Sequence, residues 1–468
     1  MPLPQEFAVS DHPPADAVIR HVLAPTTRKT QLVVLISSFL TVIMTIGPNL
    51  SYGVFQEYYV TNSGTLLPPS EAKNRGAVAL VGTVGAGLTW AGSIVVNPLM
   101  TRVRGNANRN IALAGCFLMS LAYGLAGSCD RLWQLALTQG LMYGLGSSML
   151  YFPLLSIAPE YFDRHRGLAM GFILSGAGVG GLILSPTVRI LLDNFDARWS
   201  LRILALANLA ITFPIAFFAP PSRSTIRRPT LVNPAIVKKP AFILQSFAAL
   251  LQASGNFVPM TFLPEFSTVL GYSVSFGATL LAINNGVNAV SRVLMGFAAD
   301  NLGRQNTLVL GVIGSAVSVL GLWLAAANTG DKTFWVMFVV IYGILAGKRK
   351  TIQASATLYH ILNPSLAGGY NALFPTTVTD VFGVHAYASV NGFLYFIRGL
   401  GAMFGSPVGG LILGSSRTLL PSEDTARLLK DYQRLIWYDG ALLVGSSLCV
   451  IGVRGFDALE KRRWAWKA

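Results

Sequence analysis

Long apolar runs alternate with short polar stretches along most of this chain. We count twelve such runs, each about 20 residues or slightly longer, the length that an α-helix needs to cross a hydrocarbon layer about 30 Å thick. The pattern predicts an all-α polytopic membrane protein. Its transmembrane helices are expected at residues 32–57, 76–98, 110–129, 132–156, 166–190, 200–219, 241–264, 275–298, 307–327, 334–347 continued at 369–378, 387–413 and 436–453.

The composition supports a membrane protein. Of the 468 residues, 52% are hydrophobic and only 12% are charged, and the mean hydropathy is +0.54. Soluble proteins carry about 25% charged residues, so roughly half of the usual charge is missing. Because the apolar runs extend along nearly the whole chain, they do not describe a soluble domain with one anchor. The lipid bilayer is therefore the first expected partner.

The net charge of +15 does not indicate a nucleic-acid partner. No basic stripe is interleaved with exposed aromatic residues, and no zinc-finger, helix-turn-helix or RNA-binding pattern occurs. The cysteines lie in apolar runs without the spacing of a metal site or a disulfide, so we expect packing residues, no metal and no cofactor. They are Cys116, Cys129 and Cys449.

The positive charge is distributed unevenly between the two sides of the membrane. If both termini lie on one side, that side carries 19 lysines and arginines and the opposite side carries 10. Cytoplasmic segments are enriched in these residues, so both termini are predicted to be cytoplasmic, with the plasma membrane as the expected location. Residues 1–31 contain no apolar core, which favours a cytoplasmic tail over a cleavable signal peptide, and 454–468 form the second tail.

A proline-bearing basic stretch, 220–240, separates the sixth run from the seventh near the middle of the chain. It cannot cross a bilayer, and we interpret it as a cytoplasmic linker. It joins an N-terminal six-helix half, 32–219, to a C-terminal six-helix half, 241–453. Transporters built from two such halves place the substrate site near the middle of the membrane, between the halves.

The tenth apolar run is interrupted by Lys348, Arg349 and Lys350 and by a mixed stretch that ends at Gly368. Three adjacent cations inside a bilayer would cost several kcal/mol. Removing 348–368 joins the flanking pieces into one continuous span. We therefore interpret 348–368 as an insertion, and we hypothesise that it is an intervening gene segment that the functional message lacks.

Enzymatic motifs are missing from the sequence. Neither Gly-x-Ser-x-Gly nor His-Glu-x-x-His nor Cys-x-x-Cys occurs, so we expect no catalytic residues and no enzyme. Charged residues inside apolar runs are better candidates for function, because facing lipid costs them at least a few kcal/mol. Arg292 and Arg398 should face the bundle interior and attract an anionic substrate. The alternative is a structural arginine bonded to backbone carbonyls.

Neutral polar residues accompany these arginines inside the apolar runs. Asn288 precedes Arg292 by four residues, so the two should share a helix face. The first and seventh spans each contain a broken polar segment of the kind that borders a central cavity, with helix kinking as the alternative role. The neutral candidates for substrate binding are Asn49, Tyr52, Asn256, Asn288, Asn391 and Tyr395.

Several motifs occur together in this chain. They include the turn Gly296-Phe-Ala-Ala-Asp300-Asn-Leu-Gly303-Arg304, the end of the first span at 51–59, and the stretches 153–186, 380–383 and 398–407. Together they resemble the major facilitator superfamily, and within it the monocarboxylate porter branch of fungal type. The resemblance covers 32–453 without the insertion. It implies a fold of twelve transmembrane helices in two halves that tilt about a central site.

The resemblance also implies roles for single residues. Arg292 matches the arginine that pairs with the substrate, whereas Asp300, Gly303 and Arg304 match a cytoplasmic gate in which Arg304 lies near the opposing half. Lactate carriers of this branch have a lysine at the position of Asn49 and an aspartate at that of Asn288. The largely uncharged surroundings favour a bulkier organic acid or secondary metabolite over lactate.

We therefore predict a secondary active or facilitative transporter of a small organic acid or secondary metabolite, acting as a monomer, with efflux as one candidate direction. Three alternatives stay open. One is a proton-coupled monocarboxylate uptake carrier, in which the proton is a second partner. Another is a nutrient-sensing receptor built on a transporter fold. The last is a non-functional product with a broken tenth span.

Overall fold

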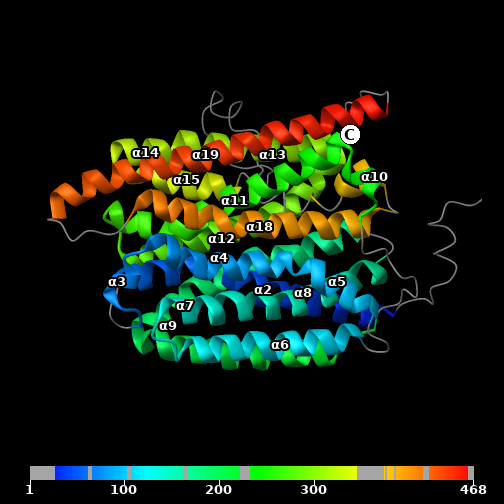
Figure 1. Ribbon diagram of the computed structural model, residues 1–468, viewed down its shortest axis with the longest axis horizontal. Helices are drawn as coiled ribbons and strands as arrows, with labels where there is room; N and C mark the ends of the chain where they lie inside the picture. The colour runs from blue at the N-terminus through cyan, green and yellow to red at the C-terminus, as the bar shows by residue number, and fades with distance from the viewer. Residues whose placement is uncertain are drawn as a thin grey trace, which may run out of the picture.

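A computed structural model of the chain describes residues 27–61, 66–102, 107–162, 166–221, 232–344, 374, 377–383, 386–414 and 421–461. The described residues form a bundle of long helices with two stacked halves (Figure 1). The N-terminal half contains α2 (Arg28–Thr61), α3 (Pro69–Ala72), α4 (Arg75–Ala91), α5 (Ser93–Arg102), α6 (Ala107–Ala126), α7 (Leu132–Leu135), a π-helical segment (Ala136–Met142), α8 (Tyr143–Tyr161) and α9 (Arg166–Phe217).

The short helix α10 (Pro234–Val237) leads into the C-terminal half. It lies at the same end of the bundle as the C-terminal end of α19, whereas α3 lies at the opposite end (Figure 1). The second half contains α11 (Pro240–Val269), α12 (Val274–Leu302), α13 (Arg304–Ser318), a π-helical segment (Val319–Trp323), α14 (Leu324–Thr329), α15 (Lys332–Ile344), α18 (Tyr387–Leu413) and α19 (Pro421–Glu460).

The described helices confirm a polytopic membrane protein. Nine helical segments among the described residues are long and apolar enough to cross a membrane. Large apolar side chains on their outer faces stay exposed, as lipid contact requires; Leu206, Leu411 and Leu448 are examples. The proposed insertion and the parts of the tenth predicted span that flank it lie outside the described residues, so the total of twelve spans and the insertion at 348–368 stay predictions.

The segment Ala169–Phe217 contains two of the predicted spans. Its 49 residues would reach about 74 Å as one straight helix, far more than a bilayer of about 30 Å. Asp196 breaks the helix with a φ of +60°. Its carboxylate accepts hydrogen bonds from the backbone N–H groups of Arg198 and Trp199, at 2.7 and 3.2 Å, and so caps the second part. The predicted boundary between 190 and 200 is therefore confirmed.

The polar turn expected at 296–304 is shorter than predicted. Helix α12 continues to Leu302, and α13 begins at Arg304. Gly303 alone forms the turn, with a φ of +87°. A glycine adopts this left-handed conformation without steric cost, and the alanine and leucine residues before it are good helix formers. The predicted length of the turn was wrong for this reason.

The most extensive contacts between the two halves are those of α4 with α18, α9 with α12, and α2 with α11. Glycine permits the close approach between α9 and α12. A Cβ atom on Gly178 would lie 2.7 Å from the backbone nitrogen of Ala289. Membrane helices associate through close packing because apolarity alone does not drive them together in lipid. These inter-helix surfaces place the polar residues that are described next.

Candidate substrate site

Arg292 lies between the two halves with only 5% of its surface exposed. Its Nε donates to Oδ1 of Asn288 at 2.9 Å, which confirms that the two residues share a helix face. Its Nη1 donates to the backbone carbonyl of Leu174 in α9, also at 2.9 Å. Both acceptors are neutral, and no acid among the described residues forms an ion pair with Arg292. The guanidinium therefore bridges the halves with its charge uncompensated by a carboxylate.

Arg398 of α18 reaches the opposite half through an aromatic ring. Its guanidinium carbon lies 4.4 Å from the ring centroid of Trp90 in α4 and 5.8 Å from that of Phe374. A desolvated cation over an aromatic face is stabilised by about 2 kcal/mol, and Arg398 is 2% exposed. This contact fixes the second buried arginine against the N-terminal half.

Aromatic residues of both halves contact each other close to Arg398. Tyr395 of α18 packs edge-on against Phe152 of α8, with ring centroids 6.0 Å apart. Tyr151, which precedes Phe152 in α8, is buried and packs edge-on against Phe152 with ring centroids 5.2 Å apart. We define the central site as Trp90, Tyr151, Phe152, Asn288, Arg292, Tyr395 and Arg398. It combines two buried cations with aromatic rings contributed by both halves.

Asn391 belongs to the same face of α18 as the central site. It precedes Tyr395 by four residues and Arg398 by seven, a spacing that repeats on one side of a helix. Its Oδ1 is buried and has no hydrogen-bond donor among the described residues. This oxygen is therefore an acceptor available to a bound molecule.

Two other predicted residues are not brought into the central site. The Nδ2 of Asn49 donates to Oγ1 of Thr89 at 3.3 Å, between α2 and α4. The hydroxyl of Tyr52 donates to the backbone carbonyl of Val78 at 2.6 Å, between the same helices. Both side chains are thus engaged inside the N-terminal half.

Asn256 lies in α11 of the C-terminal half and is not one of the residues that form the central site. Its Oδ1 accepts from the hydroxyl of Tyr342 at 3.5 Å. The next residue, Phe257, packs edge-on against Trp90 with ring centroids 5.6 Å apart. Asn256 therefore adjoins the central site through its neighbour and not through its own side chain.

Arg304 forms its ion pair within the C-terminal half. Its Nη1 forms an exposed ion pair with Oδ1 of Asp380 at 2.9 Å, and Asp380 belongs to the same half. Gly303 turns the chain within a single residue, so Arg304 starts α13 and reaches Asp380 of the 377–383 segment. The side chain of Asp300 lies outside the described residues, so the gate role of Asp300, Gly303 and Arg304 stays a prediction.

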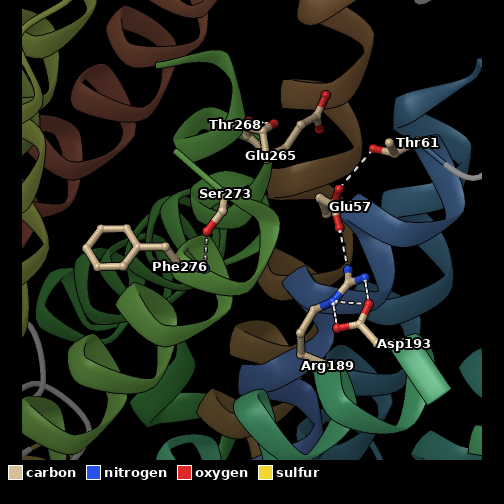
Figure 2. A network of polar contacts seen from close by, with 8 residues as sticks. All are labelled: Glu57, Thr61, Arg189, Asp193, Glu265, Thr268, Ser273 and Phe276. Atoms are coloured by element: carbon tan, nitrogen blue, oxygen red, sulfur yellow. Dashed lines mark hydrogen bonds and ion pairs between the residues drawn. The ribbon is translucent and has the colours of Figure 1, made fainter. Parts of the chain in front are cut away.

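The sequence interpretation did not single out a group of charged residues near the α3 end of the bundle. Nε of Arg75, in α4, lies 2.5 Å from Oε1 of Glu265, in α11, and this ion pair joins the halves. Figure 2 shows Glu265 near Glu57 of α2, which pairs with Nη1 of Arg189 at 3.2 Å; Arg189 also pairs with Asp193. The sequence did contain a signal for this group, because Glu57 and Glu265 lie near the ends of the first and seventh apolar runs.

Asp439 was also missed. It lies in α19, near the start of the last apolar run, and none of its surface is exposed. Both carboxylate oxygens are buried without a hydrogen-bond donor among the described residues. The signal in the sequence was a single acid surrounded by apolar residues, which in a membrane helix indicates function by default.

Comparison with known proteins identifies the family. The model of the Major Facilitator Superfamily matches residues 32–348, which is more than half of the chain. The chain belongs to the major facilitator superfamily. The match ends where the proposed insertion begins, and it confirms the family that the sequence motifs resembled.

Related members of the superfamily are fungal transporters. The MFS-type transporter pynF of Aspergillus niger is 27% identical over 92% of this chain and 89% of its own length. The aspyridones efflux protein apdF of Emericella nidulans is 23% identical over 87% of this chain and 76% of its own length. The agnestins efflux protein AgnL12 of Paecilomyces divaricatus is 26% identical over 70% of this chain and 74% of its own length.

A solved structure shares the fold of this superfamily member. The bacterial homologue of the human lysosomal transporter Spinster, in an inward-facing and occupied conformation, superposes with a TM-score of 0.63. The match covers 93% of this chain and 98% of that structure, with 17% sequence identity. At this identity the similarity concerns the fold alone.

Proposed function

We propose that this protein is a secondary active or facilitative transporter that moves a small organic acid or secondary metabolite by alternating access. The observation that carries the proposal is Arg292, buried between the halves and hydrogen-bonded to neutral acceptors. Desolvation makes a buried cation costly, and an opposite charge offsets that cost. An anionic group of the substrate supplies the missing charge.

The other residues of the central site suit the remainder of such a substrate. Trp90 and Tyr395 offer aromatic surface, which contributes more than area burial alone when it meets another ring. Asn391 offers an acceptor oxygen, and Asn288 holds the guanidinium of Arg292 in place. This combination favours a conjugated organic acid with a polar substituent over a small acid such as lactate.

Transport out of the cell is the proposed direction. The names of two relatives, the aspyridones efflux protein and the agnestins efflux protein, support it. We place the α10 end of the bundle in the cytoplasm, with both termini on that side and the protein in the plasma membrane. The excess of lysine and arginine in the segments at that end supports this orientation.

Binding by the purified protein tests the site. The full chain in lipid nanodiscs is heated with a panel of aromatic and aliphatic organic acids and with their neutral methyl esters. We expect acids, and not esters, to raise the melting temperature, and Arg292→Gln to abolish the shift. Arg434→Gln removes an arginine of the same half whose side chain is 67% exposed, and it serves as the control. An unchanged shift in Arg292→Gln would show that the site is wrongly assigned.

Metabolite profiling tests the activity. Cells that lack the gene are complemented with the wild-type chain or with Arg292→Gln, and organic acids are quantified inside and outside. We expect an acid to accumulate inside the cells that lack the gene and inside those complemented with Arg292→Gln. In cells complemented with the wild-type chain, the same acid should appear in the medium. Equal profiles in all strains would overturn the proposed transport.

A further inference from the structure

The outer corner of the N-terminal half, where α6 meets the second part of α9, carries positive charge without an acid. Helix α6 begins at the α10 end of the bundle (Figure 1), and Arg109 lies in its first turn. Arg109 is partly exposed, and no acid or hydrogen-bond acceptor among the described residues binds its guanidinium. The sequence contains no aspartate or glutamate between Glu71 and Asp130, or between Asp196 and Glu265. Neither helix therefore supplies a counter-charge.

Phenylalanine rings continue the surface from Arg109 toward the middle of the membrane. The guanidinium carbon of Arg109 lies 5.9 Å from the ring centroid of Phe217. Phe217 stacks on Phe213 at 5.9 Å, and Phe213 packs edge-on against Phe117 of α6 at 5.8 Å. The three rings, which we call the aromatic ladder, are between 39% and 53% exposed. They form one outward surface that begins at a cation.

The length of the aromatic ladder suits one leaflet. Phe117 follows Arg109 by eight residues, which corresponds to about 12 Å along a helix axis. One leaflet of the hydrocarbon core is about 15 Å thick. A lipid whose headgroup lies at Arg109 therefore has its acyl chain beside the rings over most of the leaflet.

Contacts behind the rings hold the two helices together. Nδ2 of Asn208, in α9, donates to Oγ of Ser120, in α6, at 2.7 Å. Oγ1 of Thr212 lies 3.0 Å from Sγ of Cys116, within hydrogen-bond distance. Cys116 and Thr212 each precede a phenylalanine of the aromatic ladder in the sequence. The rings are thus carried by a fixed pair of helices, and a rigid surface loses less entropy when it binds a partner.

An anionic phospholipid has the chemistry that this surface lacks. The planar guanidinium of arginine matches the geometry of a phosphate. A sterol hydroxyl brings no charge, and a zwitterionic headgroup brings a cation of its own. The sequence adds Arg102 and Arg104 within the seven residues before Arg109, which favours a headgroup with a net negative charge. Such lipids are concentrated in the cytoplasmic leaflet, where they attract basic segments near the membrane.

We propose that Arg109 and the aromatic ladder bind a single anionic phospholipid. The phosphate accepts hydrogen bonds from Arg109, and one acyl chain lies along Phe217, Phe213 and Phe117. The leaflet follows from the orientation proposed above, whereas binding itself does not depend on it. The site is separate from the central site, since Arg292 and Arg398 belong to the other half.

Native mass spectrometry measures this binding. The full chain in detergent is titrated with phosphatidylserine or with phosphatidylcholine of the same acyl chains, and the Kd of the first bound lipid is determined. We expect phosphatidylserine to bind more tightly. Arg109→Gln should raise its Kd about fivefold, the effect of one cation near an anionic lipid. Lys238→Gln removes an exposed cation just after α10 and is the matched control, with an unchanged Kd.

A second pair of variants tests the rings. Phe213→Leu removes the middle ring of the aromatic ladder but keeps an apolar side chain. It should raise the Kd for phosphatidylserine, by a smaller factor than Arg109→Gln does. Phe404→Leu, at a 59% exposed phenylalanine of α18, is the control and should bind as wild type does. Equal values for Phe213→Leu and Phe404→Leu would contradict a role of the rings.

Photo-crosslinking locates the lipid in the wild-type chain, so the test does not depend on a variant that folds. Phosphatidylserine with a photoreactive acyl chain is irradiated with the full chain in nanodiscs, and the labelled peptides are identified. We expect the label on α6 and the second part of α9 in excess over other lipid-facing helices. Unlabelled phosphatidylserine should compete for this label, and a sterol should not.

Three results would overturn the lipid site. The first is binding of phosphatidylcholine as tightly as phosphatidylserine. The second is an equal loss of affinity in Arg109→Gln and Lys238→Gln, which would show diffuse attraction by all cations at this end. The third is a label that is spread evenly over the outer helices or displaced by the sterol. No transported substrate is present in these measurements, so failure here is distinct from failure of the proposed transport.

Discussion

Arg75 and Glu265 form a buried ion pair between the two halves, although 190 residues separate them in the chain. The side chains are 7% and 6% exposed, respectively. Arg75 begins α4 and Glu265 lies near the end of α11, so the pair closes the α3 end of the bundle (Figure 1). For this end to open in alternating access, the pair has to separate.

Glu265→Gln should shift the protein toward states in which the α3 end is open. Removing one partner of a buried ion pair costs about 3–5 kcal/mol, because the other charge is left buried. Opening hydrates Arg75 and relieves that cost. Spin labels at the exposed positions Lys73 and Ser275, one in each half, should show longer distances in the variant.

The matched control is Glu71→Gln. Glu71 pairs with Arg131 at 3.3 Å within the N-terminal half, and the Arg131 side chain is 58% exposed. Exposed pairs of this kind contribute about 0–1 kcal/mol, so the distances should equal those of wild type. Equal distances in Glu265→Gln and Glu71→Gln would contradict a closing role for the buried pair.

Trp90→Leu should weaken binding of the organic acid that the nanodisc screen identifies. The ring lies 4.4 Å from the Arg398 guanidinium, and loss of a contact worth about 1–2 kcal/mol corresponds to roughly a 5- to 30-fold rise in Kd. Trp90→Phe keeps an aromatic face and should lose less binding affinity than Trp90→Leu. Titration calorimetry measures the Kd of each variant and so checks this order of affinities. Trp133→Leu, at a tryptophan that is 63% exposed, should bind the acid as wild type does.

Gly178→Ala should destabilise the contact between α9 and α12. The added methyl group would lie 2.7 Å from the backbone nitrogen of Ala289, which a helix cannot move without repacking. Overpacking of this kind costs about 1–3 kcal/mol, and thermal unfolding in nanodiscs measures it. Gly171→Ala lies in the same helix with nothing within 4 Å, so it should leave the melting temperature unchanged.

Sequencing of the mature transcript tests the interruption at 348–368. We expect the abundant message to lack this segment, which would join 334–347 to 369–378 in one apolar span. Expression of both forms as fluorescent fusions should then show the shorter chain in the membrane in larger amounts. A transcript that encodes all of 348–368 would refute the hypothesis of an intervening gene segment.

Positions of spans could be predicted from the sequence because they follow from local properties. The break between the fifth and sixth spans coincides with the polar stretch that contains Asp196, and the apolar runs on both sides are helical. The end of α12 was predicted too early, because polarity alone does not end a helix. Gly303 ended it through its backbone conformation.

Part of the candidate site could also be predicted from the local sequence. The helical repeat was sufficient to place Asn288 beside Arg292 and Asn391 on the same face of α18 as Tyr395 and Arg398. The repeat contains no information about the helix that faces each residue. Tyr52 therefore looked equivalent to Tyr395 in sequence, although its hydroxyl is bound inside one half.

The apolar pattern and the local motifs were thus enough to establish a helical transporter of two halves and its buried arginines, because a bilayer imposes the same length and polarity on every span. Packing determined which charges meet. Arg75 faces Glu265 across the halves, whereas Arg304 faces Asp380 within one half. Such partners are far apart in the chain, and their separation in space depends on how whole helices are arranged, which no local pattern encodes.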